Sequence, residues 1–339
     1  MLVPAAVLFV RVQDDVADRR DSTRLEQHGV EYLTALSPLI SALAESQSAR
    51  LSGVTGPSSS LVTAVNGVAN ADLRLGEELR TTERWRDLRK RIDALPSASG
   101  GSLAVFQTHV EVADLTLALY DAVRTNARLV RDPDNDLSHL QQAVAVDLPA
   151  TVVEVSRMGD LSRLVASASA AQREQLSPQF GAAVLAVNTY VGSLTDNLQA
   201  AVDDTNSGTL SGNLVTPLDT FRKGVESLTR GANPGGAPDA STMATAQSQL
   251  QVSLASLAGV AVREMASLLA ARLDRLDNRA LEALAAAGVA VLLALGAIAL
   301  PFLGRRRPAR PRPPAPVAVA PADVDLVHDE TRERTGALR

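Results

Sequence analysis

The chain has 339 residues, no cysteine and a formal net charge of −5. The lack of cysteine excludes disulfides, thiolate nucleophiles and cysteine-based zinc sites, and the acidic balance argues against a general nucleic-acid-binding protein. Aromatic residues make up 3% of the chain and hydrophobic residues 46%. Aliphatic side chains must therefore form the core of any folded domain.

The first ten residues, MLVPAAVLFV, form a short apolar segment that ends at Arg11. As a helix this segment reaches about 15 Å, which is half the hydrocarbon thickness of a bilayer. It lacks the basic segment and the small-residue cleavage site of a signal peptide. Two interpretations remain open. Residues 1–11 are the remnant of a first membrane helix shortened by a wrongly placed start, which we favour, or an apolar end that dips into the membrane interface.

Residues 12–282 are predicted to form an all-helical domain. Turn signals rich in glycine, proline and serine occur only at long intervals, and between them apolar residues recur at helical spacing, as in Leu250, Leu254 and Leu257. The pattern predicts helices near 12–51, 60–94, 103–130, 138–170, 179–205, 214–230 and 241–303. Long helices bury their apolar stripes in bundles. We therefore expect an all-α fold, a long antiparallel helical bundle, with two stacked four-helix layers as one arrangement of it.

Proline positions refine these boundaries. Ser177-Pro178 and Thr216-Pro217 each place a hydroxyl directly before a proline, which is typical of the start of a helix. We expect two helices to begin there. Pro38 stands inside the first predicted helix, where it removes a backbone hydrogen bond, so we expect a kink or a break at that point.

Residues Ala283–Leu303 contain no charged side chain. As a helix they reach about 31 Å, enough to cross a hydrocarbon core of about 30 Å. A buried core helix is the alternative, but Arg305, Arg306 and Arg307 follow directly and are typical of a cytoplasmic membrane anchor. We predict a transmembrane helix at 283–303 in a bacterial inner (plasma) membrane, an extracytoplasmic domain at 12–282, and a disordered, basic, proline-rich cytoplasmic tail at 304–339.

Catalytic and metal-binding patterns are scarce. The four histidines, at 28, 109, 139 and 328, lack the i, i+4 spacing of a helical metal pair, and no phosphate-binding loop or nucleophile elbow is present. The run Asp132-Pro133-Asp134-Asn135-Asp136 is similar to the start of a calcium loop, but the glycine and glutamate that the loop needs are replaced by Leu137 and Ala143. We therefore predict no enzyme activity, cofactor or metal, and a helix–helix turn in which Asp136 caps the second helix.

Two motifs carry a resemblance to a known family. The stretch 115–164 contains DPDND, then a helix with LP at 148–149 and RMGDL at 157–161, and the N-terminal run EQHGVEYL spans 26–33. In this order the motifs resemble the helical extracytoplasmic sensor region of bacterial methyl-accepting chemotaxis proteins and sensor histidine kinases. The resemblance implies a ligand-sensing bundle next to the membrane. Its candidate ligand-binding residues are Glu26, Tyr32, Asp132, Asp134 and Asp136.

The sequence also departs from that family. Leu137-Ser138-His139 stands where the family tends to have Ser-Tyr-Tyr, and Ser46-Gln47-Ser48 where it often has His-Arg-Gly. Family members continue after the membrane into a linker and a signalling domain, whereas this sequence continues into the proline-rich tail. We therefore expect the output to come from a separate protein.

These observations lead to one expected function and one alternative. The expected protein is a membrane-anchored sensor or receptor of bacterial signal transduction, whose outer domain detects a small molecule or a partner. Its expected partners are the lipid bilayer, a second copy in a homodimer and a separate cytoplasmic or membrane signalling protein, but not nucleic acid. The alternative is an envelope scaffold that binds other proteins and has no small-molecule ligand.

Overall fold

The computed structural model describes the backbone of residues 2–205, 207–232 and 239–303, and the side chains of 10–205, 207–232, 239–293, 295 and 296. Over these residues the chain is helical and contains no strand, so the all-α prediction is confirmed. The predicted tail at 304–339, with the proposed anchor Arg305, Arg306 and Arg307, lies outside the described residues. The helices are α1 (Leu2–Leu51), α2 (Ser59–Leu75), α3 (Thr82–Ala94), α4 (Ser102–Asn126), α5 (Asn135–Gln142), α6 (Leu148–Ser167), α7 (Ala170–Asp204), α8 (Gly208–Ala232) and α9 (Ala240–Leu303).

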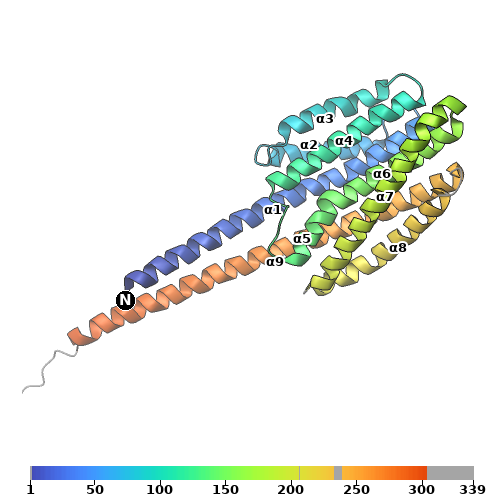
Figure 1. Cartoon of the computed structure of the whole chain (residues 1–339). Helices are drawn as coiled ribbons and strands as arrows, with labels where there is room; N and C mark the ends of the chain where they lie inside the picture. The colour runs from blue at the N-terminus through green and yellow to red at the C-terminus, as the bar shows by residue number, and fades with distance from the viewer. Residues whose placement is uncertain (1, 206, 233–238, 304–339) are drawn as a thin grey trace, which may run out of the picture. The chain divides into compact units, whose positions relative to one another are not determined.

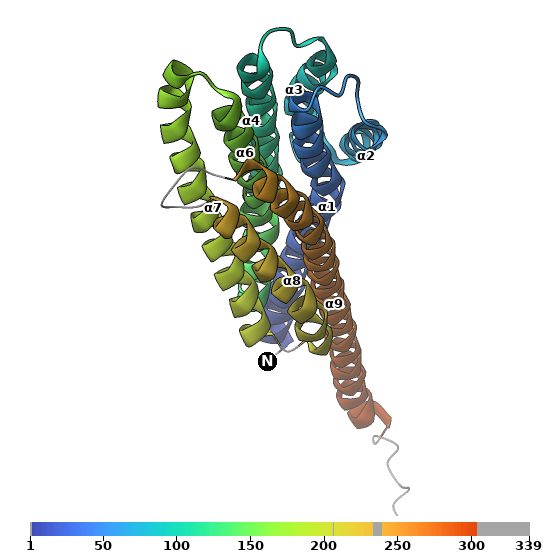
Figure 2. The same ribbon diagram turned by 90° about the vertical axis from the view of Figure 1, so that its right-hand side faces the viewer.

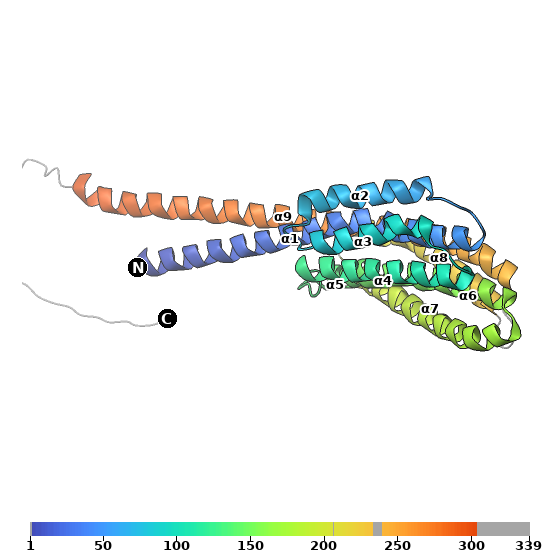
Figure 3. The same ribbon diagram turned by 90° about the horizontal axis from the view of Figure 1, so that it is seen from above.

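The helices preceding α9, together with the first part of α9, form a bundle with one continuous aliphatic core (Figure 1). Helix α1 packs against α2, α4 and α6, and α7 packs against α5, α6 and α8. Helices α2 and α7 lie on opposite sides of the bundle in two perpendicular views (Figure 2, Figure 3). Helix α9 contributes Leu250, Leu254, Leu257 and Met265 to the core, at the helical spacing that the sequence shows.

The chain divides into two compact units, Met1–Ala285 and Ala286–Arg339, with the boundary inside α9. The first unit holds the bundle. In the second unit the described residues belong to the end of α9, and their large apolar side chains are more than half exposed, namely Val289, Val291, Leu292, Leu293 and Leu295. Among the described helices, α9 alone has the length and composition needed to cross a membrane. The candidate span runs from Ala240 to Leu293, and the bounds 283–303 stay a prediction.

Several predicted helix boundaries are wrong. The helix predicted at 60–94 is two helices, because the chain turns at 76–81, where the Thr81 N–H donates to the Gly76 carbonyl (2.8 Å) and Arg80 takes a positive φ of 51°. The helix predicted at 138–170 begins at Asn135 and includes a π-helical segment, Ala143–Asp147, between α5 and α6. Apolar periodicity alone reports neither this turn nor the π-helical segment.

The two helix starts predicted at Pro178 and Pro217 are also wrong. Both prolines lie inside helices, in α7 and α8. Helix α7 begins after Ser169, whose hydroxyl accepts from the Gln172 N–H while the Gln172 side chain accepts from the Ser169 N–H. This reciprocal capping box fixes the start of the helix at Ala170, eight residues before Pro178. Pro38 likewise lies within α1, which continues through it without a break.

Residues 2–11 are the start of α1, so the first helix begins earlier than predicted. Val10 and Val12 are exposed. Whether this end is the remnant of a membrane helix stays a prediction.

Candidate functional site between α1, α2 and α9

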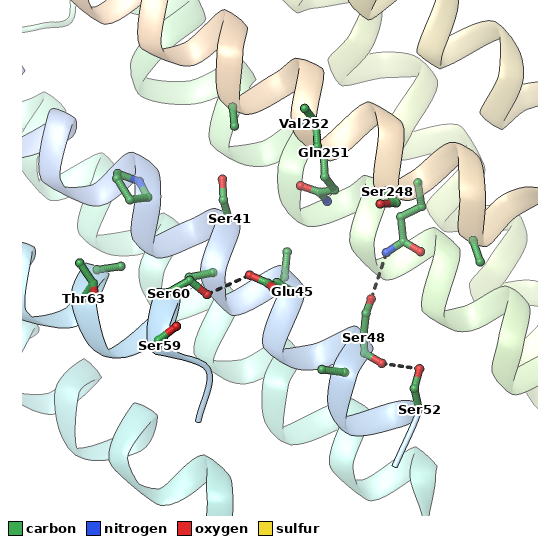
Figure 4. Close-up of a pocket in the computed structure, with 18 of the residues that line it drawn as sticks. Ser41, Glu45, Ser48, Ser52, Ser59, Ser60, Thr63, Ser248, Gln251 and Val252 are labelled. Atoms are coloured by element: carbon green, nitrogen blue, oxygen red, sulfur yellow. Dashed lines mark hydrogen bonds between the residues drawn. The ribbon is translucent and has the colours of Figure 1, made fainter. Parts of the chain in front are cut away.

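A groove of about 1110 Å³ lies between α1, α2 and α9 (Figure 4). Twenty-one residues line it; we call this surface the groove. Its floor is a stripe of α1 at i, i+3 and i+4 spacing, Pro38, Ser41, Glu45 and Ser48, followed by Ser52 just beyond the end of the helix. One wall comes from α2 and includes Ser59, Ser60, Thr63 and Gly67, and the other comes from α9 and includes Ala244, Gln247, Ser248, Gln251, Val252 and Ala255.

The lining residues are small and mostly neutral. Only Glu45, from α1, and Arg163, from α6, carry a charge among them. The Ser60 hydroxyl donates to the Glu45 carboxylate at 2.9 Å and ties α2 to α1. The groove therefore offers hydroxyl and amide groups on an aliphatic base, which suits binding by hydrogen bonds and close packing.

A buried carboxylate, Asp160 of α6, lies beneath one end of the groove. Its oxygens accept hydrogen bonds from Gln47 Nε2 and Ser48 Oγ, both at 2.9 Å, and from Arg163 Nη1 at 3.1 Å. Gln247 Nε2 of α9 in turn donates to Ser48 Oγ at 3.2 Å. Burial raises the pKa of Asp160, and these donors act in the opposite direction. The network joins α1, α6 and α9 at the floor of the groove.

Gly159 lets α9 approach α6 at this point. A Cβ at residue 159 would lie 2.1 Å from Gln247 Oε1, closer than any van der Waals contact. The glycine of the RMGDL motif therefore has a packing role, and its aspartate is the buried Asp160. The Ser46-Gln47-Ser48 segment contacts that aspartate, so two motifs that are more than a hundred residues apart meet here.

Three of the predicted ligand-binding residues meet elsewhere, around Arg272 of α9. Arg272 Nη1 lies 3.3 Å from Glu26 Oε2 of α1 and 2.9 Å from Asp132 Oδ2, and Arg272 Nη2 contacts Asp132 Oδ1 and, at 2.8 Å, Asp134 Oδ2. We call these four residues the Arg272 cluster. It links α1, α9 and the turn between α4 and α5. That these three carboxylates bind a ligand stays a prediction.

The electrostatics of the Arg272 cluster are unbalanced, because three carboxylates share one guanidinium. Burial, and then the charge of Asp132, raise the pKa of Glu26 to about 7, against the opposing effects of Arg272, Ser22 and Arg128. The pKa of Arg272 is raised too: desolvation lowers it, but the bonds and charges of Asp132, Asp134 and Glu26 outweigh that effect. Arg272 therefore stays charged.

The other two predicted ligand-binding residues are separate from this cluster and from each other. The Tyr32 hydroxyl is buried and donates to Asp72 Oδ1 at 2.9 Å, which also accepts from Thr81 Oγ1 at 2.8 Å. Asp136 accepts from Thr205 Oγ1 at 2.9 Å. It lies in the first turn of α5, whose N-cap is Asp134, so the predicted capping role of Asp136 is wrong.

Among the described residues no group of three or more histidine, aspartate or glutamate side chains could hold a metal ion. The groove itself was missed at the level of sequence. The signal that could have found it is the absence of charge from Ala240 to Val262 and from Ser59 to Ala71. Such stretches predict a covered surface only when the fold brings them side by side.

Comparisons with protein-family models, with curated proteins and with solved structures give no match for this chain. Its function must therefore be inferred from its own residues.

Proposed function

We propose that the chain is a membrane-anchored sensor or receptor of bacterial signal transduction. In this proposal the bundle lies outside the cytoplasm and detects a small molecule or a partner at the groove. The end of α9 is the membrane anchor, and a separate signalling protein supplies the output. The resemblance to the chemoreceptor and sensor-kinase input region belongs to the same proposal.

One observation carries the proposal: a single helix, α9, contributes to the groove and continues without interruption to the apolar segment that ends at Leu303. Gln247, Gln251 and Val252 face the groove, while Arg272 joins α9 to α1 further along. A shift of a packed helix by 1–2 Å is a known means of signalling. An occupant of the groove that moves α9 would move its far end as well.

The envelope scaffold remains the second candidate. It is supported by the chemistry of the groove, because small neutral side chains on three helices also suit the docking of another helix. The two candidates differ in what occupies the groove and in whether that occupant shifts α9.

The test is thermal unfolding of the full chain in lipid nanodiscs against small anions, organic acids and amino acids. A ligand that binds the native state raises the midpoint in a dose-dependent manner. The variant Val252→Trp should abolish this rise, because Val252 is 70% exposed and lines the groove. Leu185→Trp is the matched control, since Leu185 is 69% exposed on α7 and should leave the rise intact. A cooperative chain that responds to no compound in the panel, but binds a protein in the groove, would favour the scaffold.

A further inference from the structure

Most of the outer face of helix α2 carries no charge; the exception is Arg74 in its last turn, which pairs with Glu31 of α1. Every exposed residue from Ser59 to Leu73 is neutral, and the stripe Val62, Asn66, Asn70 and Leu73 points away from the core. Leu73 is 85% exposed, the highest value among the large apolar residues of the bundle. An exposed helix of a bundle in water normally carries charged side chains on this face.

The neighbouring surface shows the same lack of charge. Helix α9 has no charged residue from Ala240 to Val262. The only charged residues that line the groove between the two helices are Glu45 and Arg163. Helix α3, next to α2, is a contrast, because its exposed residues include Glu83, Arg84, Arg86, Asp87, Lys90, Arg91 and Asp93. Depletion of charge is the compositional mark of the centre of a protein–protein interface. Helix α7 also has an uncharged stretch, Gln175–Thr195, so it is the groove together with the lack of charge that distinguishes the surface of α2 and α9.

The dimensions of α2 and of the groove agree. Helix α2 has 17 residues and is about 25 Å long. The floor of the groove runs along α1 from Ala35 to Ser52, which is also about 25 Å. Small side chains on the floor let two helix axes approach to about 8–10 Å.

We propose that the groove receives α2 of a second copy of this chain, and that the two copies do this reciprocally in a two-fold homodimer. Because α2 is itself a wall of the groove, each copy can insert its α2 into the partner's groove while its own groove receives the partner's α2. Both copies then use the same surface, as an isologous interface requires. The contact covers Val62, Leu73 and Val252, which are otherwise in water. This inference rests on the proposed function in one respect: both treat the groove as a binding surface, and the inference names its occupant.

Membrane anchoring fixes the register of this dimer. Within one copy Ser60 contacts Glu45 and Asp72 contacts Tyr32, so α2 runs antiparallel to α1 and Asn66 lies about level with Pro38 and Ser41. Two copies held at the same height in one membrane would then place Asn66 of one copy near Ser41 of the other.

The first test is the mass of the full chain in detergent by multi-angle light scattering. Wild type should be a dimer, and Gly67→Trp should raise its dissociation constant at least about tenfold by blocking the groove. Nothing lies within 4 Å of a Cβ at Gly67, so the tryptophan does not clash inside its own copy. Gly181→Trp is the matched control, because Gly181 is equally open and lies on α7, whose stretch Gln175–Thr195 is also uncharged.

The second test uses the absence of cysteine. Copies with Asn66→Cys and copies with Ser41→Cys, distinguished by tags and mixed in bilayers, should form a disulfide between unlike copies, whereas Gly181→Cys with Ser41→Cys should not. A wild-type monomer in both detergent and bilayers, a Gly67→Trp dimer, or dissociation by Gly181→Trp overturns the proposal. These readouts do not depend on any ligand. A dimer whose unfolding midpoint is unchanged by every compound in the thermal-unfolding panel would therefore support this inference and contradict the proposed sensor function.

Discussion

The groove and the Arg272 cluster lie on the same two helices, α1 and α9, and have opposite chemistry. The groove is open and nearly free of charge, whereas the cluster places three carboxylates around one largely buried guanidinium. The charged residues that the sequence suggests as a ligand site therefore hold the helices together, whereas the surface suited to a partner is lined mainly by serine and alanine. Each of the following predictions tests one side of this contrast.

The largest effect is expected from Arg272→Met. It leaves Glu26 and Asp132 buried without their cationic partner, which costs about 3–5 kcal/mol of unfolding free energy. Denaturant unfolding measures the loss. Arg275→Met, at an exposed position on the same helix, is the control and should change the free energy by less than about 0.5 kcal/mol. Equal effects of the two substitutions would mean that the cluster does not fasten α1 to α9.

The next effect concerns pH and Glu26. Its pKa is about 7 in the native state and 4.5 in the reference state, so the native chain binds more protons between these values. Stability therefore falls as pH rises from about 4.5 to 7, by about 3 kcal/mol from this group. Glu26→Gln should remove that fall, which unfolding titrations at pH 4.5 and pH 8 would reveal. Glu31→Gln, on the exposed side of α1, should keep the wild-type fall; a Glu26→Gln chain that also keeps it contradicts the account.

Gly159→Ala should disturb the floor of the groove. The added methyl would meet Gln247 Oε1, and Gln247 is buried and bonded to Ser48. We expect a loss of about 1–3 kcal/mol, most of it recovered in the double variant Gly159→Ala/Gln247→Ala. Calorimetry of the two variants checks this, and failure of the second substitution to restore stability would point to strain elsewhere.

The smallest effect is expected for Ser48→Ala, which removes one of the donors to the buried Asp160. The loss should be about 1–2 kcal/mol. Ser52→Ala, just beyond the end of α1, removes only an exposed bond to the Ser48 carbonyl and should be close to neutral. If both behave alike, the network beneath the groove contributes little to stability.

The fold was largely predictable and the sites were not, for physical reasons. Apolar periodicity depends on each helix alone, so the all-α bundle and the long last helix follow from the sequence. The proline signal places the start of α7 at Pro178, whereas the helix begins after the capping box Ser169–Gln172, which is also a local signal. The Arg272 cluster joins residues 26, 132, 134 and 272, and only the tertiary fold places them together. The same holds for the groove, because only the tertiary fold brings the uncharged segments 59–71 of α2 and 240–262 of α9 together across α1.

The central claim is that α9 anchors an extracytoplasmic bundle in a membrane, and labelling of single cysteines in intact cells tests it most directly. The natural absence of cysteine makes each label specific. A membrane-impermeant maleimide should label Arg86→Cys, on the exposed face of α3, and should leave Leu292→Cys unlabelled until detergent is added. Labelling of Leu292→Cys in intact membranes to the same extent as Arg86→Cys, or protection of Arg86→Cys until the cells are lysed, would contradict the account.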